Sequence, residues 1–358
     1  MKEKMVLPFY IKLAFVIIIL TVLTYVAVIA QKLIIPLCFS FLFSILLLPF
    51  CNFLENRLRF PRTLASVLAS VLFIFSLVYV LYLLGAQLAS FSKDWPLLKT
   101  QLAGLMATMQ TWVADTFHID AKKETAFISN TKDSLLHLNG AFVGQTLLSI
   151  SSLILFVVFV LIYTVFILCY RRLLVKVVVA TFTDTHAVLI NEILEEVKQI
   201  IKGYIVGLFL EMIIVFVFAL VIFLILGIKY VIVLAIIVGV FNLIPYVGIF
   251  SALVFSVCVT FATSDAKHAL FVGISIICIH LLDSNFVGPK IVGSHVNVNP
   301  FLIILGVVVG EMIWGIPGMF ISIPLLAIGK VIFDKVEGLK PLGILLGEEE
   351  PVIKKNDC

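Results

Sequence analysis

The chain has 358 residues, of which 62% are hydrophobic and only 13% are charged, and its formal net charge is +4. The mean hydropathy of +1.22 is too high for a soluble domain, because no ordinary soluble core absorbs that much apolar surface. The small net charge, without a basic stripe, also excludes a nucleic-acid-binding protein.

Long apolar runs lie along the whole chain. About 20 apolar residues cross a hydrocarbon core of about 30 Å as a helix. Runs that reach or approach this length are residues 11–30, 33–50, 63–86, 149–170, 205–228 and 301–333. They are apolar on every face, whereas the strands of a membrane barrel alternate polar and apolar residues. The sequence therefore predicts an all-α, polytopic membrane protein.

The first apolar run follows a basic start, with Lys2, Lys4 and Lys12. A cleaved signal peptide and a membrane anchor both begin in this way. We interpret the run as an anchor, because the next run begins almost at once at Leu33, as in a tight helical hairpin.

The orientation follows from the lysines and arginines of the short loops, which concentrate on the cytoplasmic side. They occur before the first run, after the second and after the fourth, as Lys2, Lys4, Lys12, Arg57, Arg59, Arg62, Arg171, Arg172 and Lys176. We therefore expect both termini in the cytoplasm and residues 87–148 outside it.

Residues 87–148 contain a stripe of apolar side chains at alternating spacings of three and four. The stripe comprises Leu88, Phe91, Trp95, Leu98, Leu102, Leu105, Met109 and Trp112. This spacing predicts a small helical insert with one apolar seam. The seam either packs on residues 124–148 or serves as a lid or a self-association surface, which would make the protein a homo-oligomer.

Residues 185–204 form an amphipathic pattern. One face carries Leu189, Ile193, Val197, Ile200 and Tyr204, and the charged residues lie largely opposite. We expect a cytoplasmic helix that lies in the membrane interface and leads into the next span.

Two apolar stretches are interrupted near their centres. Residues 231–262 are broken around Asn242, Pro245 and Tyr246, and residues 301–333 around Pro317. Proline removes a backbone donor and disfavours helix in the residue before it. Irregular backbone at membrane depth must be buried in protein or line a wet cavity, so paired broken helices favour a transport site. Two ordinary hairpins between short tilted helices are the alternative.

The stretch DSNFVGPKIVGSHVNVNP, residues 283–300, is unusually polar for this chain. We expect a structured loop at the mouth of a transport site, its path set by Pro289 and Pro300. Asn285 and Asn297 offer hydrogen bonds to a polar solute, and Asp283 with backbone carbonyls would bind a cation or proton. Helix capping is the alternative for these residues.

Three ionisable residues, Glu211, His280 and Glu311, lie inside apolar runs. A charge at bilayer depth is costly and usually marks a pathway, a proton relay or a buried partner. His280 precedes Asp283 by three residues, so the two share a face if the helix continues. Glu211, His280 and Asp283 are thus candidates for a proton relay, with neutral, packed carboxyls as the alternative.

Several absences exclude other functions. The sequence has no phosphate-binding Gly-x-x-x-x-Gly-Lys motif, no His-Glu-x-x-His and no Cys-x-x-Cys, and its six cysteines lack metal-ligand spacing. We therefore expect no enzyme, no ATP hydrolysis, no cofactor and no metal.

The segment from Leu281 to Phe333, with the upstream NLIPYVG, resembles the autoinducer-2 exporter family, in particular its PerM-like permeases. The residues that fit the family pattern are Asp283, Asn285, Pro289, Gly293, Asn297, Pro300, Gly315, Gly318 and Pro324. Glu311 matches no position of that pattern. The resemblance implies a multi-pass exporter of a small polar solute, such as an autoinducer-like furanosyl compound, in the bacterial inner membrane.

Two alternatives to this exporter stay open. A cation/proton antiporter is favoured by Glu211, Asp283 and Glu311, and a non-transporting scaffold would use the insert. If the protein is a transporter, we expect four regions in chain order: N-terminal transmembrane helices (1–86), an extracytoplasmic insert (87–148), a transport core (149–340) and a cytoplasmic tail (341–358). The expected partners are membrane lipid and a small polar solute or cation.

Overall fold

The computed structural model describes residues 8–92, 100, 104, 138–182, 187–245, 247–291 and 298–347. Every regular element in these ranges is a helix. Six of the described helices are long and apolar enough to cross a membrane. The prediction of an all-α, multi-pass membrane protein is confirmed.

The helices follow the apolar runs and extend beyond several of them. The first five described are α1 (Phe9–Ile29), α2 (Gln31–Asn56), α3 (Arg62–Ser92), α6 (Leu138–Thr181) and α7 (Ala187–Ile225). The amphipathic stretch 185–204 has no boundary at its end, because α7 continues through it into the next apolar run. Most of the predicted insert, including most of its apolar seam, lies outside the described residues.

The chain divides into two compact units, each assembled from segments distant in sequence. Unit 1 comprises Met1–Ser70, Phe159–Leu208 and Ile291–Cys358, and unit 2 comprises Val71–Val158 and Phe209–Lys290. The division at residues 86, 148 and 340 concerns the sides of the membrane and stays a prediction.

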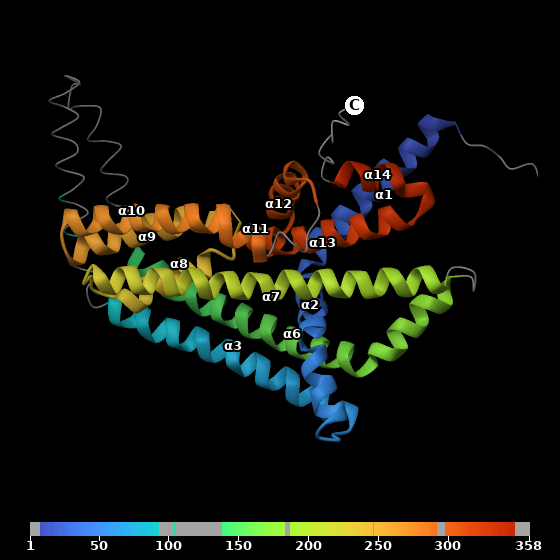
Figure 1. Cartoon of the computed structure of the whole chain (residues 1–358), viewed down its shortest axis with the longest axis horizontal. Coiled ribbons are helices and arrows are strands. Elements are labelled where there is room, and N and C mark those ends of the chain that lie inside the picture. The colour runs from blue at the N-terminus through green and yellow to red at the C-terminus, as the bar shows by residue number, and fades with distance from the viewer. Residues whose placement is uncertain are drawn as a thin grey trace, which may run out of the picture. The chain divides into compact units, whose positions relative to one another are not determined.

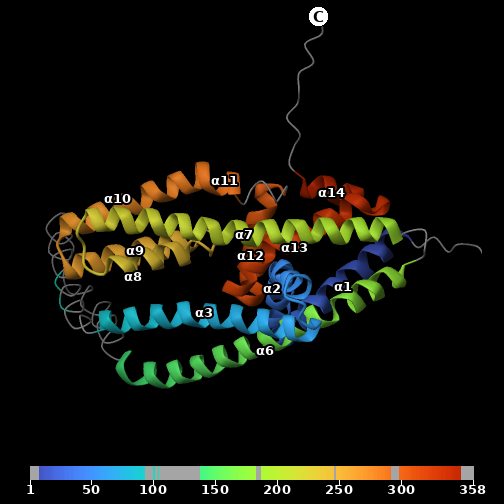
Figure 2. The ribbon, with the colours of Figure 1, turned by 60° about the horizontal axis from the view of Figure 1, so that its bottom comes forward.

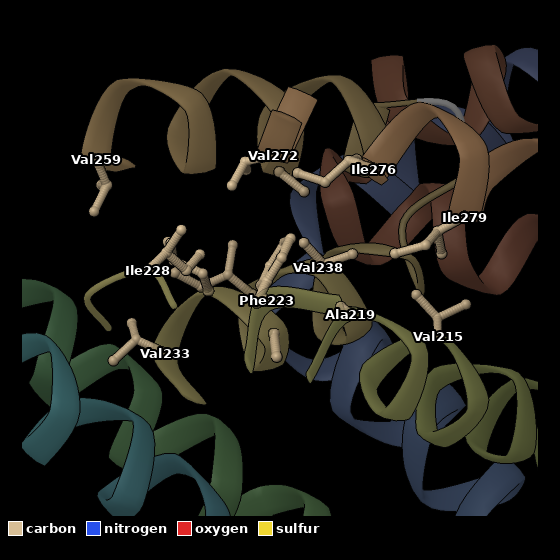
Figure 3. Close-up of a cluster of buried hydrophobic side chains, with 14 residues drawn as sticks. Val215, Ala219, Phe223, Ile228, Val233, Val238, Val259, Val272, Ile276 and Ile279 are labelled. Atoms are coloured by element: carbon tan, nitrogen blue, oxygen red, sulfur yellow. The ribbon is translucent and has the colours of Figure 1, made fainter. Parts of the chain in front are cut away.

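Unit 2 is built around α8 (Val231–Phe241), α9 (Val247–Thr263) and α10 (Ala266–Leu282), which lie beside one another (Figure 1). Figure 3 shows their buried side chains packed with Val215, Ala219 and Phe223 from α7. These three residues recur every four positions, so they form one face of α7. At about 1.5 Å per residue, α8 is too short to cross a bilayer.

The turn between α8 and α9 is tight, since a Cβ atom on Gly248 would clash with the Phe241 carbonyl oxygen. A Cβ atom on Gly239 would lie 3.0 Å from the Met212 carbonyl oxygen, so α8 also lies directly against α7. Glycine at both positions lets the backbones approach closely.

Unit 1 contains the second interrupted stretch as a hairpin of α12 (Pro300–Trp314) and α13 (Ile316–Lys335), seen in Figure 2. The chain turns at Gly315, whose φ of 64° suits glycine. Gly310 and Gly318 bring the two backbones into contact. The indole N–H of Trp314 donates to the Ala27 carbonyl at 2.9 Å, which ties the hairpin to α1.

The C-terminal helix α14 (Lys340–Leu346) follows a short 3-10 turn, η4 (Glu337–Leu339), and packs on α13. The Asn299 backbone N–H donates to the Leu346 carbonyl at 2.8 Å. Part of the expected tail therefore belongs to the fold of unit 1, and residues 348–358 lie outside the described residues.

Both predicted helix breaks are confirmed, at residues 242–245 and at Gly315. The predicted loop at 283–300 is wrong over residues 283–291, which continue α10 as a π-helix, η2 (Asp283–Val287), and a short α11 (Gly288–Ile291). Pro289 cannot donate an α-helical bond to the Asn285 carbonyl. The wider π turn, in which Gly288 N–H donates to the Asp283 carbonyl, carries the helix past this gap.

Candidate functional site

Three polar side chains from separate segments of unit 2 meet at one place. Glu211 comes from α7, Asn242 from the end of α8, and Asp283 from the start of η2. The Asn242 side-chain amide donates to Glu211 Oε1 at 3.3 Å and to Asp283 Oδ2 at 3.1 Å. One neutral amide therefore bridges two carboxyl groups, which also interact with each other.

Local backbone geometry positions each of these groups. Asn242 caps the end of α8, where its backbone N–H donates to the Val238 and Val240 carbonyls, so its side chain is free to turn away from the helix. Asp283 occupies the first position of a π turn, a distortion common at functional sites. A Cβ atom on Gly288 would lie 3.6 Å from Glu211 Oε1, so glycine keeps this turn close to the carboxyls.

The carboxyl groups of the site are not fully compensated by hydrogen bonds or positive charge. Asp283 is only 6% exposed, and its Oδ1 is buried without a hydrogen-bond partner in the part of the chain that the structure describes. A buried, unpaired carboxylate oxygen is costly, and two neighbouring carboxylates repel each other. A shared proton or a small cation would relieve both costs. Within the described ranges, no cluster of three His, Cys, Asp or Glu residues forms a metal site.

The remaining candidates for a proton relay or pathway lie elsewhere. The His280 ring lies 3.4 Å from the Ser284 hydroxyl, and the structure gives it no contact with Asp283. Asn285 is exposed and donates to the Leu281 carbonyl of its own helix at 2.7 Å. Glu311 is exposed on α12, in unit 1.

The candidate prolines mark the ends and starts of helices. Pro245 lies in the turn between α8 and α9, and Pro289 is exposed in α11. Pro300 and Pro317 lie in the first turns of α12 and α13, where a missing N–H costs nothing. Asn299 caps α12 by accepting a hydrogen bond from Phe301 N–H at 2.9 Å. Tyr246 and Asn297 lie outside the described residues.

The sequence supplied all three residues of the cluster. Glu211 and Asp283 were grouped with His280 as a candidate proton relay, and Asn242 was a candidate as part of a helix break, but its position between the two carboxyls was not predicted. The role of Gly288 was missed. Its position directly before Pro289 was the available signal, since a glycine-proline pair marks an irregular turn.

Replacing Asn242 by leucine is expected to destabilise the protein by about 1–3 kcal/mol, because both carboxyls lose their shared donor while the volume is kept. Thermal unfolding of the purified protein in detergent measures the effect. Asn285→Leu is the matched control, since it removes an exposed amide that bonds only within its own helix. Equal unfolding midpoints for the two variants would show that the Asn242 bridge contributes nothing to stability.

Comparisons with known proteins find similarity to transport proteins. A family model described as AI-2E family transporter matches residues 14–338. YueF of Bacillus subtilis, strain 168, is 27% identical over 90% of this chain and 91% of its own length. YrrI of the same organism is 29% identical over 83% of this chain and 84% of its own. Both are named as transport proteins.

Proposed function

The chain belongs to the AI-2E transporter family, and from this premise we propose that it moves a small polar solute across the bacterial cytoplasmic membrane without ATP hydrolysis. The Glu211–Asn242–Asp283 cluster is its polar site. A furanosyl compound of the autoinducer-2 type is the first solute to test, and the direction of movement is export.

One observation carries this proposal: three polar side chains converge beside the apolar core of unit 2. Buried ionisable groups in membrane proteins are expensive and are characteristic of transport pathways. The cluster adjoins a broken helix, since Asn242 ends α8 and α9 begins only at Val247. Non-helical backbone of this kind is typical of substrate and ion sites in secondary transporters.

A flux assay in liposomes tests the proposal. Purified protein is reconstituted, the vesicles are loaded with autoinducer-2, and its loss is followed against protein-free vesicles. We expect loss that saturates with solute concentration and needs no ATP. Vesicles that retain autoinducer-2 and show no cation or proton flux would favour the scaffold alternative, in which the insert binds another protein.

Cation/proton antiport is the second candidate, and the unpartnered Asp283 Oδ1 favours it. Two ionised carboxylates only accept hydrogen bonds, which suits a cation or a proton. A hydroxyl-rich solute both donates and accepts, so it also needs hydrogen-bond donors from the protein. A pH-sensitive dye inside the same vesicles separates the candidates. Internal pH that responds to an imposed sodium or potassium gradient, without any added solute, identifies antiport.

We also propose cytoplasmic termini and an extracytoplasmic insert. The proximity of two basic segments within unit 1 supports this, because Arg171 Nη2 donates to Glu55 at 2.9 Å and to Asn52 at 3.1 Å, just before the Arg57–Arg62 segment. Lysine and arginine on one side mark the cytoplasmic face.

A cysteine introduced at Lys122, in a variant without the six native cysteines, is expected to react with a membrane-impermeant thiol reagent in intact cells. The position lies within the proposed extracytoplasmic insert. A second cysteine, at Lys176, serves as the cytoplasmic control and should react only after lysis. The reverse labelling pattern would invert the topology.

A further inference from the structure

A cavity of mixed character lies within unit 1, where α2, α6 and the first half of α7 line a volume of about 550 Å³. Its lining changes character along α2. Phe41 and Ile45 are apolar, whereas Asn52, two to three helical turns further on, is polar. The cavity thus has an apolar part and a polar part.

The polar part is predominantly cationic. Arg171, Arg172 and Lys198 line it together with Glu195, and Glu55, outside the lining, pairs with Arg171 at 2.9 Å. Lys198 pairs with Glu195 at 3.1 Å, but both side chains are exposed, and exposed pairs are weak. Arg172 is exposed and forms no ion pair within the described residues.

Arg171 adds a buried donor to this cationic part. Its Nη2 is held by Glu55 and Asn52, which fixes the plane of the guanidinium group. Its Nη1 is buried and has no hydrogen-bond partner among the residues described. The guanidinium is thus fixed in place, and its planar shape matches a phosphate group better than a flexible ammonium does.

We propose that this cavity binds an anionic phospholipid, with the phosphate on Arg171 and Arg172 and the start of an acyl chain against Phe41 and Ile45. The apolar part distinguishes a lipid from a free phosphate ion, which would gain nothing from it. All three helices contain candidate membrane spans, so a lipid reaches the cavity from the bilayer. Basic pockets between membrane helices bind anionic headgroups in this way.

The site lies in unit 1, does not involve Glu211, Asn242 or Asp283, and does not depend on the proposed transport. Its test therefore needs no flux. The purified full-length protein in nonionic detergent is titrated with phosphatidylglycerol, with phosphatidylcholine of the same acyl chains, and with glycerol 3-phosphate. The shift of the thermal unfolding midpoint reports binding.

We expect a saturable rise with phosphatidylglycerol, and little or none with the other two ligands. Arg172→Gln should weaken phosphatidylglycerol binding about tenfold, as expected for one lost charge-assisted hydrogen bond. Lys176→Gln removes a positive charge from the same helix outside the cavity lining and should leave binding unchanged. Ile45→Trp, which fills the apolar part while every charge stays in place, should also weaken binding.

Three outcomes would overturn the proposal. Equal shifts with the two phospholipids would indicate non-specific lipid stabilisation, and an equal shift with glycerol 3-phosphate would indicate a phosphate site without an acyl chain. Equal losses in Arg172→Gln and Lys176→Gln would indicate a diffuse effect of charge. Arg172 is exposed, so its replacement is expected to fold, and Ile45→Trp tests the cavity without removing any charge.

Discussion

Gly318→Ala is expected to cost at least about 3 kcal/mol of stability, the upper end of the usual range for overpacking. A Cβ atom on Gly318 would clash with the Gly310 carbonyl oxygen, and the reverse clash occurs for Gly310. Both obstacles are backbone, so no side-chain rotation relieves them. Typical proteins are stable by only about 5–15 kcal/mol, so this single methyl group threatens the folded state.

Thermal unfolding in detergent and the yield of monodisperse protein measure this loss. Gly329→Ala is the matched control, because it makes the same change in the same helix, and its Cβ atom would meet only the Phe333 ring at 4.0 Å. That variant should be neutral or slightly stabilised, since alanine favours helix over glycine. If both variants unfold at the same midpoint, the α12–α13 hairpin is not held by backbone contact.

Asp283→Asn is expected to abolish flux while the protein still folds and inserts. The amide preserves the size of the side chain but cannot carry a negative charge or accept a proton at neutral pH. Asp283 is buried, and its Oδ2 accepts a hydrogen bond from the Asn242 amide. The carboxylate, and with it the negative charge, is therefore held in one position within the site. If Asp283 only ended a helix, asparagine would be well tolerated.

Flux in liposomes, normalised to inserted protein, measures the effect. Ser284→Ala, the neighbouring exposed position, is the control and should retain flux. Glu211→Gln shows whether flux requires both carboxyls of the cluster or Asp283 alone. We expect it to reduce flux strongly as well. Flux of Asp283→Asn equal to that of the parent protein at every pH tested would remove Asp283 from the mechanism.

The apolar runs and the helix-breaking prolines and glycines predicted much of the fold. The apolar runs predicted the membrane helices, because length and hydropathy alone decide whether a segment can cross a bilayer. Pro245 and Gly315 with Pro317 predicted both breaks, because these residues act on the local backbone. The extent of α6 and the continuity of α7 were missed. Hydropathy marks only the part of a helix that lies in the membrane, and both helices continue beyond it through charged residues.

The position of Asn242 between the two carboxyls was not predictable in the same way. Glu211, Asn242 and Asp283 are separated by 31 and 41 positions, and only packing brings them together. Helix spacing placed His280 with Asp283, but the π turn changes the register at Asp283, and the His280 ring contacts Ser284 instead. A π turn needs one extra residue per turn, and no simple residue pattern marks it.

A double-mutant cycle in flux tests most directly whether the two carboxyls act as one transport site. Flux is measured for the parent protein, Glu211→Gln, Asp283→Glu, which keeps a carboxyl group and is expected to retain a reduced flux, and the double variant, in liposomes with equal amounts of inserted protein. Because residues that act as a unit have non-additive effects, we predict that the double variant loses no more than the worse single variant. Losses that multiply, as for two independent sites, would contradict the account.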